Sequence, residues 1–212
     1  MNARCDHDRG PFEGVSADYR RRLMIVIAIN AAMFVVELTA GQLAGSQALK
    51  ADSLDFLGDA ATYGITLAVI GAASRTRALA ALGKGVSLFL MALWIFSSTI
   101  YQTLILGVPQ AEVMGLVGFG ALAANVASVL LLMRCKEGDA NVRSVWLCSR
   151  NDAIGNIAVM AAALGVWGTQ TAWPDLAVAA VMAGLFLTSS LQIISQSRRE
   201  LRQGEDAPLA RG

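Results

Sequence analysis

The sequence predicts an all-α integral membrane protein with six transmembrane helices and both termini on the cytoplasmic side. Three observations lead to this fold class. Hydrophobic residues make up 55% of the 212 residues and charged residues only 16%, below the roughly 25% charged content of soluble domains. Six apolar segments come close to the ~20 residues that a helix needs to cross a bilayer. Basic residues gather in alternate connections between these segments, as cytoplasmic loops do.

The apolar segments follow one another with short polar connections, and six of them are hard to bury in a soluble chain of this length. They are Leu23–Leu43, Ala48–Ala73, Leu79–Leu106, Val113–Met133, Val142–Trp167 and Leu176–Ile194. Pro109 and Pro174 lie in the connections before the fourth and sixth segments, where proline marks a turn. We therefore expect a membrane domain at residues 23–197, preceded by a polar tail at 1–22 and followed by a charged tail at 198–212.

The distribution of Lys and Arg sets the expected orientation. Of the 17 basic residues, 15 precede the first segment, lie in or near the second and fourth connections, or follow the last segment. Lys50 falls on the other side, and Arg150 lies within the fifth segment. Short cytoplasmic loops carry such an excess of positive charge, so both termini are expected in the cytoplasm. The net charge of +1 gives no indication of a nucleic-acid partner.

Two pairs of potential metal ligands lie inside the second and fifth segments. Asp55 and Asp59 are four residues apart, as are Cys148 and Asp152. Residues at this spacing share one face of a helix. A carboxylate within a bilayer costs on the order of 3 kcal/mol and persists mainly where it has a function. Asp59 lies ~15 Å and Asp152 ~12 Å from opposite membrane surfaces at 1.5 Å per residue, so the two pairs can meet near the bilayer centre.

Three carboxylates and one sulfur suit four-coordinate Zn(II), and the sulfur favours Zn(II) or Cd(II) over Mg(II) and Ca(II). A ligand must lose its proton to bind the metal, so protons and metal compete for the same atoms. The pattern therefore predicts proton-coupled transport of a divalent metal. The metal is then the transported substrate, and no resident cofactor is expected.

Other polar residues in the apolar segments are candidates for the transport pathway. Asp52 continues the stripe of Asp55 and Asp59, either as an access group or as an interfacial helix-start residue. Asn30 and Glu37 are seven residues apart on one helical face and can both point inward, and a role for Glu37 in function is as plausible as simple hydrogen bonding. Asn125 is expected to form an interhelical hydrogen bond. The accessory candidates are Asp52, Glu37, Asn30, Asn125 and Arg150.

Arg150 is two residues from each ligand of the fifth segment, so it projects away from their face. It can extend to the cytoplasmic surface or pair with an acid such as Glu37. The N-terminal Cys5–Asp8 sequence, CDHD, is expected to be a solvated tail.

These residues resemble the cation diffusion facilitator family of divalent-metal/proton antiporters. The resemblance covers about residues 23–197 and runs through NAAMFVVELTAGQLAGSQALKADSLDFLGDA, the fourth segment with Asn125, NVRSVWLCSRNDAIGN and the WPD that opens the sixth. It implies export of a metal, usually zinc, through the inner membrane, with Asp55, Asp59, Cys148 and Asp152 as ligands. The partners that it implies are divalent cations, protons and the lipid bilayer.

The chain departs from the family pattern at two points. Cys148 replaces the usual His or Asp, and acts either as a ligand that shifts the selectivity to softer ions or as a small apolar residue. The usual C-terminal cytoplasmic domain is not expected, since little chain follows the sixth segment. Any homodimer would then form through membrane helices, for example the third segment with Trp94.

Two other classes of function compete with transport. A membrane enzyme is disfavoured because the sequence contains no HExxH, no nucleophile elbow and no phosphate-binding glycine loop. A non-transporting regulatory or structural membrane subunit with a vestigial metal site remains an alternative, although three carboxylates of the site are present.

Overall fold

The computed structural model describes residues 17–68, 74–105, 107–133 and 140–206, without the side chains of residues 17–19, 66, 74, 77, 103–105, 132–133, 140–151 and 203–206. These residues form six α-helices. They are α1 (Ala17–Ala44), α2 (Gln47–Ala68), α3 (Ser74–Ile105), α4 (Ala111–Met133), α5 (Ala140–Thr169) and α6 (Trp173–Asp206). The predicted all-α class and the order of the helices are confirmed.

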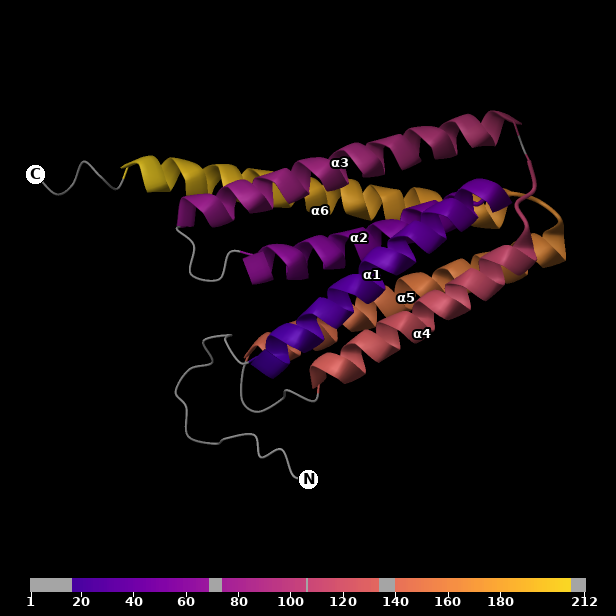
Figure 1. Ribbon diagram of the computed structural model, residues 1–212. Helices are drawn as coiled ribbons and strands as arrows, with labels where there is room; N and C mark the ends of the chain where they lie inside the picture. Colours follow the sequence, from indigo (N-terminus) through magenta and orange to yellow (C-terminus); the bar gives the residue numbers. More distant parts are fainter. Residues whose placement is uncertain (1–16, 69–73, 106, 134–139, 207–212) are drawn as a thin grey trace, which may run out of the picture.

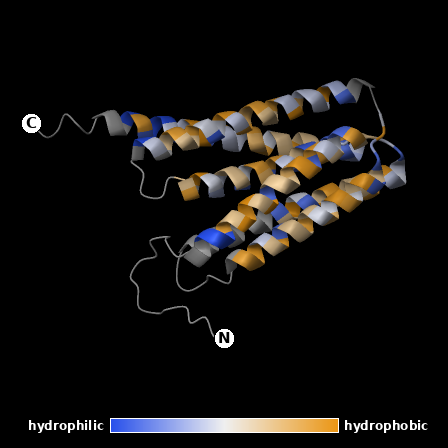
Figure 2. Ribbon diagram, viewed as in Figure 1, coloured by the Kyte–Doolittle hydropathy of each residue, from blue (hydrophilic) through white to orange (hydrophobic). Residues whose placement is uncertain are grey.

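Five of these helices, all but α2, contain a stretch long and apolar enough to cross a membrane. Helix α2 carries Lys50, Asp52, Asp55 and Asp59, so its composition alone does not identify it as a span. Its 22 residues nevertheless extend about 33 Å at 1.5 Å per residue, which matches the ~30 Å hydrocarbon core. Figure 2 shows hydrophobic residues along the whole length of the bundle. The chain is a multi-pass membrane protein.

The helices pack mainly as antiparallel pairs, α1 with α2, α3 with α6 and α4 with α5. Helix α1 also packs on α4, α2 on α3, α6 and α5, and α5 on α6. Helix α2 therefore lies at the centre of the bundle, between the α3–α6 pair and the group of α1, α4 and α5 (Figure 1).

A tight turn joins α1 to α2. Gly45 has a φ of 71°, the left-handed conformation that glycine adopts at little cost after a helix end. The Ser46 amide then donates to the Gly41 carbonyl at 2.9 Å. This short turn therefore holds the end of α1 close to the start of α2.

The apolar core lies near this turn. It includes Leu49 and Leu54 of α2, Ile95 of α3, and Val159 and Val166 of α5. Nine of the ten side chains from Gln47 to Phe56 are buried, whereas no described side chain from Leu57 to Ala68 is. Figure 1 shows α2, α3 and α6 converging with α1, α4 and α5 at the turn and diverging toward the opposite end. One end of the bundle is closely packed and the other is loose.

The end of α6 differs from the sequence-based expectation, since this helix continues to Asp206, beyond the apolar segment that ends at Ile194. The expected end of the second segment, Ala73, lies outside the described residues. The extension of α6 is polar, and the Gln196 Nε2 donates to Glu200 Oε1 one turn later at 3.0 Å. Such i, i+4 pairs support a helix that has left its apolar surroundings.

Candidate metal-transport site

Helices α2 and α5 meet at Gly155. A Cβ atom placed on Gly155 would lie 3.1 Å from Asp52 Oδ1, 3.4 Å from Asp55 Oδ2 and 3.3 Å from Met182 Cε. A larger residue would push the two carboxylates away, since small residues are what allow membrane helices to approach closely. The absence of a side chain at Gly155 therefore lets the acidic face of α2 lie against α5.

Asp152 lies on α5 one turn before Gly155 and is 8% exposed. It is within electrostatic range of both Asp55 and Asp59. Helices α2 and α5 are therefore in contact here, and the two helices carry Asp55, Asp59 and Asp152. A local concentration of negative charge in a buried region attracts cations.

The structure does not gather these groups into a closed coordination shell. Among the described side chains, no three His, Cys, Asp or Glu residues lie close enough together to hold a metal ion. The side chains of Cys148 and Arg150 lie outside the described residues, as do the N-terminal residues Cys5–Asp8. Asp55 and Asp59 are half-buried rather than enclosed, so the acidic face of α2 borders the loosely packed end.

The structure excludes one of the two roles expected for Asp52, that of a residue at the start of the helix. Helix α2 begins at Gln47, so Asp52 is not a helix-start residue, and its side chain is fully buried. Its carboxyl group lies close to that of Glu37 on α1, while none of the described residues donates to either carboxyl. An ionised carboxylate can only accept. A Glu37–Asp52 hydrogen bond therefore requires a proton on one of the two groups.

Buried polar atoms without partners among the described residues are also found on α1, α4 and α5 around this region. Asn30 faces inward on α1 as predicted, and its Nδ2 donates to the Val26 carbonyl of its own helix at 2.8 Å, which leaves Oδ1 unpaired among the described residues. The Nδ2 of Asn125 and both polar atoms of Asn156 also lack partners in that part of the chain. The interhelical bond expected for the Asn125 amide is not found there. Buried polar groups of this kind normally bind water or a ligand.

Asn156 was not singled out in the sequence, although its spacing carried a signal. It lies four residues after Asp152 and hence on the same face of α5. Its side chain is 1% exposed, so it extends the polar stripe of α5 toward the packed end of the bundle.

A second residue that sequence analysis passed over is Asp175. Its Oδ1 accepts hydrogen bonds from Ser46 Oγ at 2.6 Å and from the Ala48 amide at 3.0 Å, and its Oδ2 accepts one from the Gln47 amide at 2.8 Å. These amides belong to the first turn of α2, where backbone N–H groups have no carbonyl partner within the helix. A negative charge is also favourable at a helix N-terminus. Asp175 of α6 thus caps the helix that carries Asp55 and Asp59.

The chain is similar to a known membrane domain and to several known transporters. Residues 23–202 match the model of the cation efflux transmembrane domain. The chain is 29% identical over 207 residues to a zinc transporter, ZitB, of Pectobacterium atrosepticum, with 90% of this chain and 63% of that protein covered. It is 28% identical over 191 residues to the metal cation efflux system protein CzcD of Cupriavidus metallidurans, covering 84% and 60%.

A more distant relative is the cadmium, cobalt and zinc/H(+)-K(+) antiporter of Bacillus velezensis, 23% identical over 201 residues, with 87% of this chain and 64% of that protein covered. The chain thus spans slightly less than two thirds of the length of these relatives. The family match nevertheless extends over most of the chain and includes the four candidate ligands Asp55, Asp59, Cys148 and Asp152. The chain therefore belongs to the cation efflux family of membrane transporters.

Proposed function

We propose that this protein exports a divalent transition metal, most readily Zn(II), from the cytoplasm in exchange for protons, and binds it through Asp55, Asp59, Cys148 and Asp152. The observation that carries the proposal is the contact of α2 with α5 at Gly155, with Asp52 and Asp55 against it and Asp152 one turn away. The names of the relatives, which include zinc, cadmium and cobalt transporters, support the choice of metal.

The open coordination geometry is in keeping with transport. A resident structural metal is normally enclosed by four ligands, whereas a transported ion must enter and leave. A small movement of α2 against α5 would bring Asp55, Asp59 and Asp152 onto one ion. Cys148 lies one turn before Asp152 on α5, and its sulfur would complete the set and favour soft ions.

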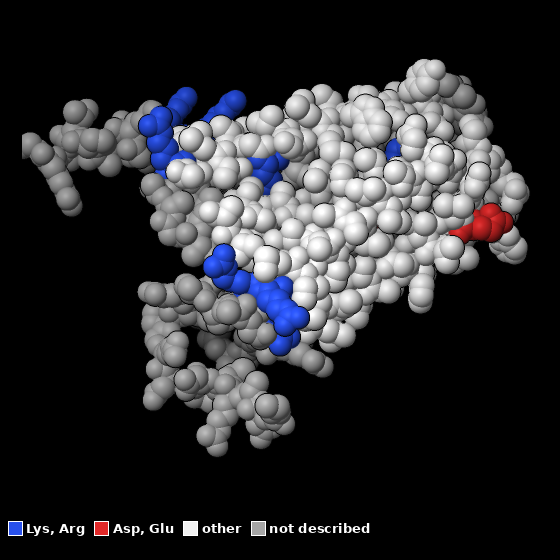
Figure 3. All heavy atoms as spheres, viewed as in Figure 1, with Lys and Arg blue, Asp and Glu red and all other residues white. Residues whose placement is uncertain are grey.

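The packing supports a state in which the site is reached from the loose end of the bundle. Asp55 and Asp59 are half-buried at that end, while the opposite end is closed by the apolar core. On the face shown in Figure 3, most Lys and Arg side chains lie toward the loose end, where α1 begins and α6 ends. Positive charge favours the cytoplasmic side, so we assign this end to the cytoplasm and the state to inward-open.

The Glu37–Asp52 pair is the best candidate for carrying the exchanged proton. Its two carboxyl groups can share a proton, as described above, and Asp52 lies against Gly155 beside Asp55. A metal ion bound at Asp55 would repel that proton because like charges oppose each other strongly in a medium of low dielectric constant. Proton release would then accompany metal binding.

Transport by purified protein in sealed vesicles tests this proposal. With a pH gradient imposed, we expect saturable uptake of Zn(II) that is abolished in Asp152→Ala and Asp59→Ala. Uptake should be retained in the control variant Glu112→Gln, which removes an exposed acid from the first turn of α4. Both aspartate variants should elute at the wild-type volume in size-exclusion chromatography, so that loss of uptake does not reflect loss of folding. Uptake that persists in both aspartate variants would refute the assigned site.

The same vesicles test the role of Cys148. If its sulfur binds the metal, Cys148→Asp should transport Co(II) and Mn(II) better relative to Cd(II), since an oxygen ligand prefers harder ions. An unchanged ranking of metals would make Cys148 a packing residue. Absence of transport of any ion by folded wild-type protein would favour the alternative of a regulatory or structural subunit. A homodimer through α3 stays a prediction.

A further inference from the structure

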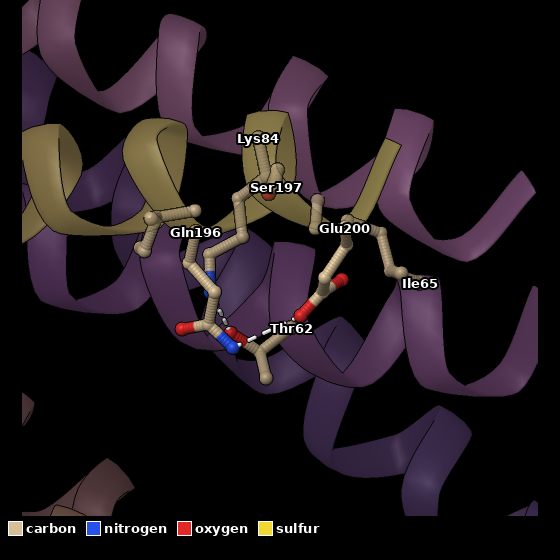
Figure 4. Close-up of a pocket in the computed structure, with 8 residues that line it drawn as sticks. Thr62, Ile65, Lys84, Gln196, Ser197 and Glu200 are labelled. Atoms are coloured by element: carbon tan, nitrogen blue, oxygen red, sulfur yellow. Dashed lines mark hydrogen bonds between the residues drawn. The ribbon is translucent and has the colours of Figure 1, made fainter. Parts of the chain in front are cut away.

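A small pocket of about 280 Å³ lies between α2, α3 and α6 on the loose side of the bundle (Figure 4). Its polar lining consists of Thr62, Lys84, Gln196, Ser197 and Glu200. Lys84 is the one charged residue of the candidate span Ala78–Gln102. It lies within the apolar segment Leu79–Leu106 and within α3, so its position needs an explanation.

The packing of α3 on α6 turns Lys84 toward α2. A Cβ atom on the neighbouring Gly85 would lie 3.0 Å from both Ile193 Cγ2 and Ile194 Cγ1, so the bare face of α3 at Gly85 is pressed against α6. Lys84 consequently projects to the side, where its Nζ donates a hydrogen bond to Thr62 Oγ1. The Thr62 hydroxyl donates in turn to the Gly58 carbonyl at 2.6 Å. The ammonium group is therefore tied to the middle of α2.

This contact brings a positive charge to the acidic face of α2. Thr62 lies three residues after Asp59, a spacing that places both on neighbouring positions of one face. Asp59 and the Lys84 ammonium are within electrostatic range of each other. Glu200, on the other side of the pocket, accepts a hydrogen bond from Gln196 and offers a second negative charge.

We infer that Lys84 is a tethered counter-cation of the metal site. In the metal-free protein its ammonium neutralises Asp59, and an arriving divalent ion displaces it into the pocket toward Glu200. This inference rests on the proposed role of Asp59 as a ligand. The metal must compete with a charge that cannot diffuse away, so Lys84 weakens metal binding and favours release of the ion.

Metal titration of the purified full-length protein tests the inference at fixed pH and ionic strength. We expect Lys84→Gln to bind Zn(II) and Cd(II) more tightly, each by at least about tenfold, because the repulsion between the ion and a unit positive charge a few ångströms away exceeds a tenfold change in affinity even at an effective dielectric constant near 20. Both metals should gain equally because a fixed charge acts on the charge of the ion and not on its softness.

Two variants serve as controls. Lys84→Arg keeps the positive charge and should stay within about threefold of the wild-type dissociation constant. Arg75→Gln removes an equal charge from an exposed position nine residues earlier on α3 and should change little. Thermal unfolding of each variant separates an effect on binding from an effect on folding.

The outcomes distinguish the two proposals. Zn(II) binding by the wild type that Lys84→Gln leaves unchanged, or weakens, overturns the role of Lys84 and leaves the transport site standing. If neither the wild type nor Lys84→Gln binds Zn(II), the proposed function fails and this inference with it. Tightening by Arg75→Gln as large as that by Lys84→Gln would show a general effect of net charge and would also overturn it.

Discussion

At the scale of single residues, the site depends on where a side chain is missing as much as on the carboxylates. Gly155 leaves room for Asp52 Oδ1 and Asp55 Oδ2, and Gly85 allows the approach of α3 to α6 that directs Lys84. Glycine costs helix stability in the interior of a helix. At both positions this cost is offset by a close contact between helices, and that contact determines where nearby charged groups lie.

Replacement of Gly155 by alanine should separate site geometry from folding. The new methyl group would meet Asp52, Asp55 and Met182 at 3.1–3.4 Å, so we expect Zn(II) binding to weaken on the order of tenfold, as when other groups that orient metal ligands are disturbed. Isothermal titration measures the change.

The matched control for this prediction is Gly168→Ala on the same helix. A Cβ atom at Gly168 would meet nothing within 4 Å, so this variant should bind metal normally and gain about 0.5–1 kcal/mol in stability. Equal affinities of the two variants would show that the contact at Gly155 does not position the ligands.

At the scale of the elements, α2 is held at its start by a residue from another helix. Asp175 of α6 accepts three hydrogen bonds from Ser46, Gln47 and Ala48. Because α2 carries Asp55 and Asp59, the Asp175 cap sets the position of α2 relative to α6. The cap lies at the packed end, so it provides a fixed point about which the loose end of α2 can move.

Asp175→Asn should destabilise the protein without removing a ligand. An asparagine amide has one acceptor oxygen, so it cannot replace all three bonds, and the expected loss is about 1–3 kcal/mol. The melting temperature in detergent should fall by several degrees. Glu112→Gln, a loss of one exposed acid in the first turn of α4, should barely change it. Equal melting temperatures would argue against a capping role.

At the scale of the whole molecule, the bundle is closed at one end and loose at the other. The residues from Gln47 to Phe56 are almost all buried, and the described side chains from Leu57 to Ala68 are not. In a transporter that alternates between two sides, the loose end is the one open to solvent. The difference in burial lies within α2 alone, so a method that reports on individual residues can measure it.

Hydrogen exchange should therefore differ along α2. We expect the amides of residues 57–68 to exchange faster than those of 47–56, because exchange follows local opening and access of water. Saturating Zn(II) should slow exchange in 57–68 by drawing α2 toward α5. Uniform exchange along α2, with and without metal, would contradict an inward-open state.

The orientation of the bundle can be tested with protease-cleavable tags at both termini. Both tags should be cleaved in inside-out vesicles and protected in right-side-out vesicles, because the basic residues favour the cytoplasmic side. Cleavage of only one of the tags in either preparation would rule out an even number of spans.

The sequence by itself determined the number, order and approximate bounds of the helices, since apolar length and helical spacing are local properties. The same spacing predicted that Asn30 and Glu37 face inward and that Asp55 and Asp59 share a face. Only the tertiary structure decided which groups meet across helices. It placed Glu37 close to Asp52, Asp175 on the first turn of α2, and Lys84 on Thr62 near Asp59. These contacts join residues between 15 and 129 positions apart. They depend on how the helices rotate and cross. That geometry is set by close packing at glycines such as Gly155 and Gly85, and helical periodicity in the sequence does not determine it.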